Sequence, residues 1–288
     1  MFIRITAGNP LGYAGPNPLN TTDPNSNVNY DWYEFDWGGT KDAIFINTTQ
    51  VDMFGLPMTL DVWGKGETFH QQTGITESVA AIDQEFTAET PAAFQAGQSP
   101  ISPLRIWAPA HKSFGTGGTN ANYFENYIAD AWSSYSTTPV TISFNGRQFI
   151  GSASGSTLTF TEVNPSSAHA GEVFVVSQPS TPDILGCAGT MARGVQGSTA
   201  QLEDENGVQL QLENQICSAT NRGVLPTPAN WANVSAYYNV APANFYSQFW
   251  HNHSIGGLAY GFSYDDNNNQ STSIVGANPE HMAFGISW

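Results

Sequence analysis

The stretch Tyr30–Met58 reads YDWYEFDWGGTKDAIFINTTQVDMFGLPM, and its pattern predicts two β-strands joined by a Gly-Gly turn. Side chains alternate between the two faces of a strand, so residues two positions apart share a face. If even-numbered positions pair with even-numbered positions, Glu34 and Asp52 emerge on one face, beside the aromatic ring of Trp32. Two carboxyl groups in one cleft can cleave a glycosidic bond: one protonates the leaving oxygen, and the other activates water or attacks.

The predicted strands cover 30–37 and 43–53, and their length separates the two acids. A tight turn sets Glu34 opposite a residue near Ile46, which leaves Asp52 about six residues, or roughly 20 Å, further along the sheet. The carboxyl groups can therefore act together only if the strands bend, bulge or pair in a shifted register. Otherwise the acids form the solvated face of an ordinary hairpin, and the pattern alone leaves both interpretations open.

The same stretch resembles the laminaripentaose-producing β-1,3-glucanases of glycoside hydrolase family 64. It carries their aromatic-Glu-Phe strand as Tyr33-Glu34-Phe35, and their segment Asn-Thr-Thr-Gln-Val-Asp-x-Phe-Gly-x-Pro at 47–57. It is similar, more distantly, to plant thaumatin-like proteins, whose acidic cleft also uses a Glu and an Asp. The resemblance is strong over 30–58, good over 183–288 and loose over 63–182. Family members carry further strands ahead of this stretch, so we expect either a fragment or another set of strands that completes the sheet.

The resemblance implies the chemical roles of the two acids. In the family, the Glu is the general acid and the Asp the general base of an inverting hydrolase, which assigns these roles to Glu34 and Asp52. Such a pair needs a raised pKa on the acid and roughly 6.5–9.5 Å between the carboxyl groups, which leaves room for water. Apolar neighbours raise the pKa of a carboxyl group, and Trp32 and Phe35 are the expected neighbours of Glu34.

Further side chains are expected to hold the sugar around these acids. On the two strands they are Trp32, Asp36, Phe45, Asn47 and Thr49. The family more often has Thr in place of Asp36 and Trp in place of Phe45, and thaumatin-like proteins have Asp in place of Asn47.

The opposite wall of the cleft is expected to come from the C-terminal part of the chain. Its predicted sugar-binding residues are Tyr260, Tyr264, Asp265, Asp266 and His251. For the two acids, a calcium-like, turn-capping or simply solvated role stays open. The pair His251 and His253 admits a zinc site, but no Cys or third His lies near them in the sequence. We therefore expect them to be helix-end histidines, and we expect no metal.

The charge balance of the chain excludes some partners. The 288 residues include 24 acidic and 8 basic side chains, which give a formal net charge of −16. This charge repels nucleic acid and anionic membranes but carries no penalty for a neutral polysaccharide. We expect β-1,3-glucan (laminarin, curdlan or cell-wall glucan) as the partner, and a monomer without nucleic acid, membrane or cofactor. No apolar run reaches the roughly 18 residues of a membrane-spanning helix.

Two cysteines, Cys187 and Cys217, fit one disulfide in a secreted protein, although two buried free thiols are the alternative. They fall on two predicted helices, 182–193 and 214–222, which the disulfide would join. The first residues lack the apolar core of a signal peptide, so secretion would imply a processed form.

The expected fold is mainly β with an α/β part. Residues 1–62 and 254–288 are expected to form a thaumatin-like β-barrel or sandwich, beginning with a short strand at 2–6. Residues 63–253 are expected to form a mixed α/β domain, and a wide groove should lie between the two. Within the second domain, Gly and Asn turns predict a β-meander over 140–176. The alternating run 257–266 predicts a strand near the end of the chain.

The resulting hypothesis is a secreted hydrolase that releases laminaripentaose-type oligosaccharides from β-1,3-glucan by an inverting two-carboxylate mechanism. One alternative is a non-catalytic, thaumatin-like glucan-binding protein. A second is a metal-dependent structural or adhesion module that uses Asp265, Asp266 and His251.

Overall fold

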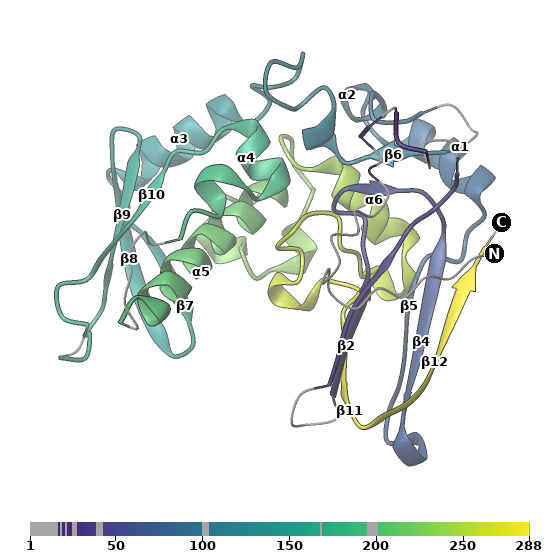
Figure 1. The fold of residues 1–288 in the computed structure, drawn as a ribbon. Coiled ribbons are helices and arrows are strands. Elements are labelled where there is room, and N and C mark those ends of the chain that lie inside the picture. Colours follow the sequence, from purple (N-terminus) through teal and green to yellow (C-terminus); the bar gives the residue numbers. More distant parts are fainter. Residues whose placement is uncertain are drawn as a thin grey trace.

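The computed structural model is shown in Figure 1. It describes residues 17, 19–20, 22–24, 28–38, 43–99, 104–167, 169–194 and 201–287, with the backbone alone at 37–38 and 201–206. The predicted strand at 2–6 lies outside the described residues.

Two antiparallel sheets pack face to face to form the first lobe, which we call the sandwich lobe (Figure 1). Their strand orders are β1-β2-β11 and β12-β4-β5. The strands are β1 (Tyr33–Gly38), β2 (Ala43–Thr48), β11 (Ile274–Ala277), β12 (Pro279–Ile286), β4 (Met58–Gly64) and β5 (His70–Gly74). Alternate residues of β2 and β4, such as Ile46 and Leu60, are fully buried between the sheets, as the two-residue period of a strand requires. β5 extends this lobe beyond residue 62, the predicted domain boundary.

The register of β1 and β2 differs from the predicted one. Glu34 lies opposite Asn47, and Asp36 lies opposite Phe45, so even positions pair with odd positions. The even-to-even pairing was therefore wrong. β2 also ends at Thr48, before the predicted end of the strand, and the chain then turns towards the short pair β3 (Met53–Phe54) and β6 (Ile106–Trp107).

A four-stranded antiparallel meander forms the second lobe and confirms the predicted β-meander. Its order is β10-β9-β8-β7. The strands are β7 (Val140–Phe144), β8 (Arg147–Ser154), β9 (Thr157–Glu162) and β10 (Val173–Ser177). Helices α3 (Glu125–Tyr135) and α5 (Gln201–Asn221) pack against this sheet. The side-chain amide of Gln209 on α5 bonds both the N–H and the C=O of Val175 on the edge strand β10.

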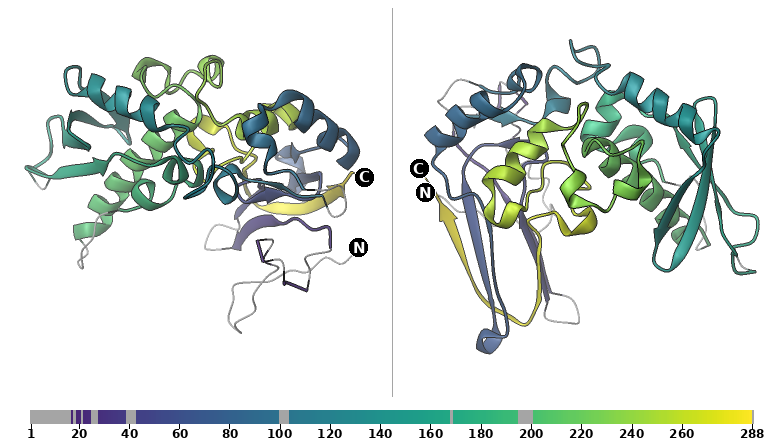
Figure 2. Two further views of the ribbon diagram at one scale, coloured as in Figure 1. Left: turned by 90° about the horizontal axis from the view of Figure 1, so that it is seen from above. Right: turned by 180° about the vertical axis from the view of Figure 1, so that it is seen from behind.

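Helices lie between and above the two lobes. They are α1 (Val79–Glu89), α2 (Ala92–Gln95), α4 (Thr181–Gly186) and α6 (Phe245–His253). Single turns of 3-10 helix occur at Lys65–Glu67, Pro109–His111, Gly189–Met191, Pro228–Asn230, Val234–Ala236, Ile255–Gly257 and Asn267–Asn269. α6 buries Tyr246, Phe249 and Trp250 in the main core, where Trp250 stacks on Phe54 at 4.7 Å between ring centroids. Figure 2 shows the sandwich lobe and the meander at opposite ends of the molecule.

The structure corrects two further fold predictions and leaves the thaumatin-like relationship untested. In the described residues the sheets are open, so the barrel alternative was wrong and two packed sheets take its place. The run 257–266 is not a strand but irregular backbone that follows a 3-10 turn and ends in a turn at 263–266. It curls because the carboxylate of Asp265 accepts a hydrogen bond from the N–H of Gly261 at 2.9 Å. The thaumatin-like relationship stays a prediction.

Candidate active site

The outer side of the β1-β2-β11 sheet carries one of the two predicted catalytic acids. Residues that lie directly opposite each other in an antiparallel pair share a face. Glu34, Asp36, Phe45, Asn47 and Val275 therefore lie together on the side away from the buried Ile44 and Ile46, and we call this side the acidic face. Glu34 and Asp36 are exposed, Phe45 is 43% exposed and Asn47 is buried. The structure thus brings four predicted site residues together.

Asp52 lies in the turn after β2, outside the sheet. Its backbone C=O accepts a hydrogen bond from Ala108 N–H at 3.0 Å. Its side chain is 56% exposed, and Oδ1 is 3.1 Å from Nε2 of His111. The sequence analysis did not identify His111, because the residue is far from Asp52 in sequence and follows no motif.

Hydrogen bonds from the C-terminal part of the chain hold this turn. Gln50 N–H donates to the C=O of Tyr260 at 2.9 Å, and the Tyr246 hydroxyl donates to the C=O of Gln50 at 2.6 Å. Thr272 Oγ1 donates to the C=O of Thr48. Thr49, a predicted sugar contact, is 3% exposed, and its hydroxyl accepts from Val51 N–H within the turn.

Tyr260 lies within electrostatic reach of Glu34. Burial raises the pKa of the Tyr260 phenol, and the carboxylates of Asp266, Glu34 and Asp265 raise it further. Its hydroxyl donates to the C=O of Ser263 at 3.2 Å. Tyr264 is partly buried and Asp266 is exposed. Among the predicted sugar-binding residues of the C-terminal part, Tyr260 is therefore one that the structure connects with Glu34 on the acidic face.

Asp265 has a structural environment that does not fit the predicted sugar contact. It is fully buried, and its carboxylate accepts from Arg222 Nη2, Ser247 Oγ, His251 Nε2 and Gly261 N–H at 2.9–3.1 Å. Burial opposes ionisation, but the positive charges of His251 and Arg222 outweigh it and hold the pKa of Asp265 below its usual value.

His251 is occupied in the same network. Its Nδ1 lies 2.8 Å from the C=O of Gly257, and its Nε2 lies 3.1 Å from Asp265, so both ring nitrogens face acceptors. Burial disfavours the charged ring, but Asp265 and Gly257 outweigh burial and raise the pKa of His251. The imidazolium is thus the form that satisfies both contacts. These contacts give His251 and Asp265 a structural role within the protein, and their predicted sugar contacts and the metal-module alternative with Asp266 stay predictions.

The approach to β1 contains an acid that the sequence analysis missed. Asp31 accepts from the N–H groups of Gly55 and Leu56 at 2.9 and 3.2 Å, and burial raises its pKa to about 7. A Cβ on Gly55 would lie 2.2 Å from the C=O of Tyr30, so this close approach requires glycine. Next to Asp31, Trp32 is partly buried and stacks on Tyr30.

Glu34 and Phe35, predicted to be neighbours, point to opposite faces of β1. Phe35 pairs with Ile46, so it points away from Glu34 and cannot act as the predicted apolar neighbour of that carboxyl group. Phe35 nevertheless remains 43% exposed.

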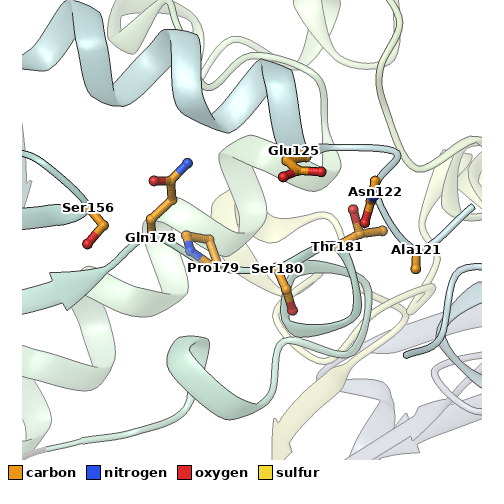
Figure 3. A pocket seen from close by; sticks show the side chains of 8 residues that line it. All are labelled: Ala121, Asn122, Glu125, Ser156, Gln178, Pro179, Ser180 and Thr181. Carbon is orange, nitrogen blue, oxygen red and sulfur yellow. The ribbon is translucent and has the colours of Figure 1, made fainter. Parts of the chain in front are cut away.

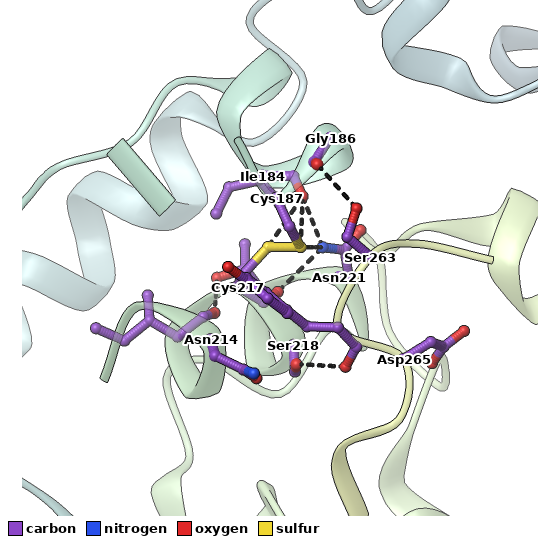
Figure 4. Close-up of a disulfide and its surroundings, with 12 residues drawn as sticks. Ile184, Gly186, Cys187, Asn214, Cys217, Ser218, Asn221, Ser263 and Asp265 are labelled. Atoms are coloured by element: carbon purple, nitrogen blue, oxygen red, sulfur yellow. Dashed lines mark hydrogen bonds between the residues drawn. A yellow bond between two sulfur atoms is a disulfide. The ribbon is translucent and has the colours of Figure 1, made fainter. Parts of the chain in front are cut away.

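The predicted disulfide is confirmed. Cys187 and Cys217 are joined with 5.9 Å between their Cα atoms, and the bond links the end of α4 to α5 (Figure 4). The Asn221 side chain donates to the C=O groups of Ile184 and Cys217 beside it. This junction fixes the helical layer behind the meander.

The meander lobe contains a pocket of about 360 Å³ that is separate from the predicted site residues (Figure 3). It is lined by Ala121, Asn122, Glu125, Ser156, Gln178, Pro179, Ser180 and Thr181. It lies where α3 and α4 begin.

The fold of this chain is similar to that of solved β-1,3-glucanase domains. A β-1,3-glucanase domain from Clostridium beijerinckii superposes with a TM-score of 0.82 at 31% identity, covering 96% of this chain and 69% of that one. A laminaripentaose-producing β-1,3-glucanase from Paenibacillus barengoltzii, also solved with laminarihexaose, has a TM-score of 0.67 at 29% identity, with 96% and 50% covered.

The family model described as beta-1,3-glucanase matches residues 1–286, and the chain belongs to glycoside hydrolase family 64. A glucan endo-1,3-beta-glucosidase from Cellulosimicrobium cellulans is 25% identical over 276 residues. The match covers 92% of this chain and 46% of that protein, so the chain spans about half the length of the curated relatives it matches.

Proposed function

We propose that this chain hydrolyses β-1,3-glucan by inversion, with Glu34 as general acid and Asp52 as general base. The observation that carries the proposal is the turn after Thr48. Because the chain leaves the sheet there, Asp52 does not lie at the far end of a straight strand. Glu34 stays exposed on the acidic face. The roughly 20 Å separation expected of a regular hairpin therefore does not apply to this pair, which supports the proposal.

The contacts of Asp52 suit a general base. His111 contacts Oδ1 at 3.1 Å, which leaves Oδ2 to take a proton from water as that water attacks the anomeric carbon. Glu34, in its protonated form, would donate its proton to the glycosidic oxygen as the bond breaks. Both side chains are exposed, so a polymer can reach them from solvent.

The surroundings of the acids fit a neutral sugar polymer. Phe45 offers an exposed ring on the acidic face, and Asp36 offers an acceptor for hydroxyl groups directly opposite it. Tyr260 and Asp266 complete the set of residues that we propose to hold the glucan. The substrates would be laminarin, curdlan or cell-wall glucan, bound between the two lobes, and the products would be laminaripentaose-type oligosaccharides.

We also propose that the protein acts as a secreted monomer. The confirmed disulfide supports this compartment, because disulfides persist outside the reducing cytosol. In the part of the chain that the structure describes, no helix is long and apolar enough to cross a membrane.

The test measures reducing ends released from laminarin and curdlan by the wild type, Glu34→Gln and Asp52→Asn. Exposed acids of α3 give matched controls, Glu125→Gln and Asp130→Asn. We expect each site variant to lose at least 10³-fold in kcat, while the controls keep wild-type rates. Equal rates in Glu34→Gln and the wild type would refute the assignment. Saturable laminarin binding without turnover in any form would favour the non-catalytic glucan-binding alternative.

A further inference from the structure

The outer end of helix α6 carries a cluster of ionisable groups away from the acidic face. His253, the last residue of α6, has a side chain that is 9% exposed and meets three carboxylates from α1 and the residues before it. Nδ1 lies 2.8 Å from Glu77 and 3.5 Å from Glu85, and Nε2 lies 3.1 Å from Glu89. The ring is held by Phe249, whose centroid is 4.1 Å away.

We propose that Glu77, Glu85 and His253 bind a divalent transition-metal ion of the Zn²⁺ type, oriented by Glu89. One ligand atom from each of the three residues lies within 4.8 Å of the others. Ligand atoms around a metal with bonds of ~2.1 Å can be up to about 4.2 Å apart, so only a small inward movement of flexible glutamates is needed. The mixture of imidazole nitrogen and carboxylate oxygen favours such an ion over Ca²⁺ or Mg²⁺.

The contact with Glu89 is the observation that separates this cluster from an ordinary acidic surface. A metal-binding histidine usually donates its other ring N–H to a carboxylate, which fixes the tautomer. Here Glu89 accepts at Nε2, and in the neutral ring this leaves the lone pair of Nδ1 directed towards Glu77 and Glu85. The cluster therefore has both the ligands and the group that orients them.

A second observation is the excess of negative charge around His253. The carboxylates of Glu77, Glu85 and Glu89 all lie within 3.5 Å of the ring nitrogens, and Oε2 of Glu85 is at 3.5 Å from Nδ1. One imidazole ring carries at most one positive charge, so it balances only one of the three carboxylates, and a bound divalent ion would supply the remaining positive charge.

The bound ion would connect two elements that are distant in the sequence. Glu85 lies on α1, Glu77 just before it, and His253 at the end of α6. The proposal departs from the expectation of no metal, which considered His253 only together with His251. It is independent of the glucanase proposal, because none of its residues belongs to the acidic face.

The test is calorimetric titration of the chelator-treated 288-residue chain with ZnCl₂, with CaCl₂ as the comparison ion. We expect one saturable Zn²⁺ site per chain and at least tenfold weaker binding in His253→Gln and in Glu77→Gln. The matched controls His281→Gln and Glu125→Gln should bind as the wild type does. Saturating Zn²⁺ should raise the Tm by roughly 5 °C in the wild type and not in His253→Gln.

Proton release gives a further readout. Metal ligands must be deprotonated, so Zn²⁺ binding should release the protons that the ligand groups hold before the metal arrives. The heat of binding should therefore change with the ionisation heat of the buffer. No one-to-one binding up to millimolar Zn²⁺, or equal affinity in the wild type and both site variants, would overturn the proposal. If either His253→Gln or Glu77→Gln fails to fold, the Zn²⁺ affinity of the other variant still tests the proposal.

Discussion

Replacing Asp265 by Asn tests whether this residue is a structural anchor. The substitution keeps the size of the side chain but removes the charge that faces Arg222 and His251. It also replaces a carboxylate oxygen, which accepts hydrogen bonds, with an N–H₂ group, which donates them. At least one of the groups that now donate to Asp265 would then face another donor. Arg222 is 0% exposed and cannot turn to water.

The magnitude follows from the burial of this pair. Breaking a buried ion pair by removing one partner costs about 3–5 kcal/mol, because the other charge is left uncompensated. For a chain of 288 residues, that loss lowers the Tm by roughly 5–8 °C. The assay is urea unfolding followed by tryptophan fluorescence, with an unchanged m-value as the check that the folded state stays compact.

The matched control lies one residue away. Asp266 is exposed, so Asp266→Asn should change the unfolding free energy by less than about 1 kcal/mol. Equal unfolding midpoints for Asp265→Asn and Asp266→Asn would refute the structural role. If Asp265→Asn were stable but lost laminarin binding, the original prediction of a sugar contact would be supported.

The same network predicts how stability depends on pH. The folded pKa of His251 is raised, so its contribution is complete below the unfolded value of about 6.5 and is lost as pH rises through the folded value. The folded pKa of Asp265 is lowered, so its contribution is present above about 3.9 and is lost as pH falls through the folded value. The wild type should lose stability at both ends, and Asp265→Asn should flatten both slopes.

Three further predictions concern positioning and backbone. His111→Ala should lower kcat on laminarin about 10- to 100-fold with little change in KM, because Asp52 loses the contact that orients it. A kcat equal to that of the wild type would show that His111 does not position Asp52. The double change Cys187→Ser and Cys217→Ser should cost about 3–4 kcal/mol in urea unfolding, since the bond closes a loop with a separation of 30 residues, and an unchanged midpoint would contradict this. Gly55→Ala should strongly destabilise the fold, because the added Cβ would lie 2.2 Å from the backbone oxygen of Tyr30. Gly207→Ala, in open space on α5, should instead stabilise the fold by about 0.5–1 kcal/mol. Similar changes in Tm for the two variants would refute the comparison.

Local signals explain which parts of the fold could be predicted. The meander over β7–β10 is encoded by alternating strands and by turns such as Asn145-Gly146, where both residues have positive φ. The disulfide followed from the number of cysteines and the composition. These features depend on short segments or on counts, so a single sequence contains them.

The missed features depend on contacts between distant segments. The register of β1 and β2 depends on the number of residues in their connection, and a one-residue difference moves every side chain to the other face. The run 257–266 alternates like a strand, but the buried ion pair with Arg222 overrides that pattern. The carboxylates around His253 come from residues far earlier in the chain, so the motif at the end of α6 gave no sign of them.

Helix α6 takes part in several contacts between distant segments, and this bears on how the two acids are positioned. Its Tyr246 bonds the turn that leads to Asp52, and its Ser247 and His251 hold Asp265 in the segment that carries Tyr260. Since Asp52 lies outside the sheet, strand pairing with β1 does not determine its position relative to Glu34. That position depends on hydrogen bonds from α6, such as the one from Tyr246 to Gln50, and the proposed general acid and base would need a rigid support of this kind to stay aligned across one linkage. Substitutions at the buried polar side of α6 should therefore lower kcat without touching the substrate.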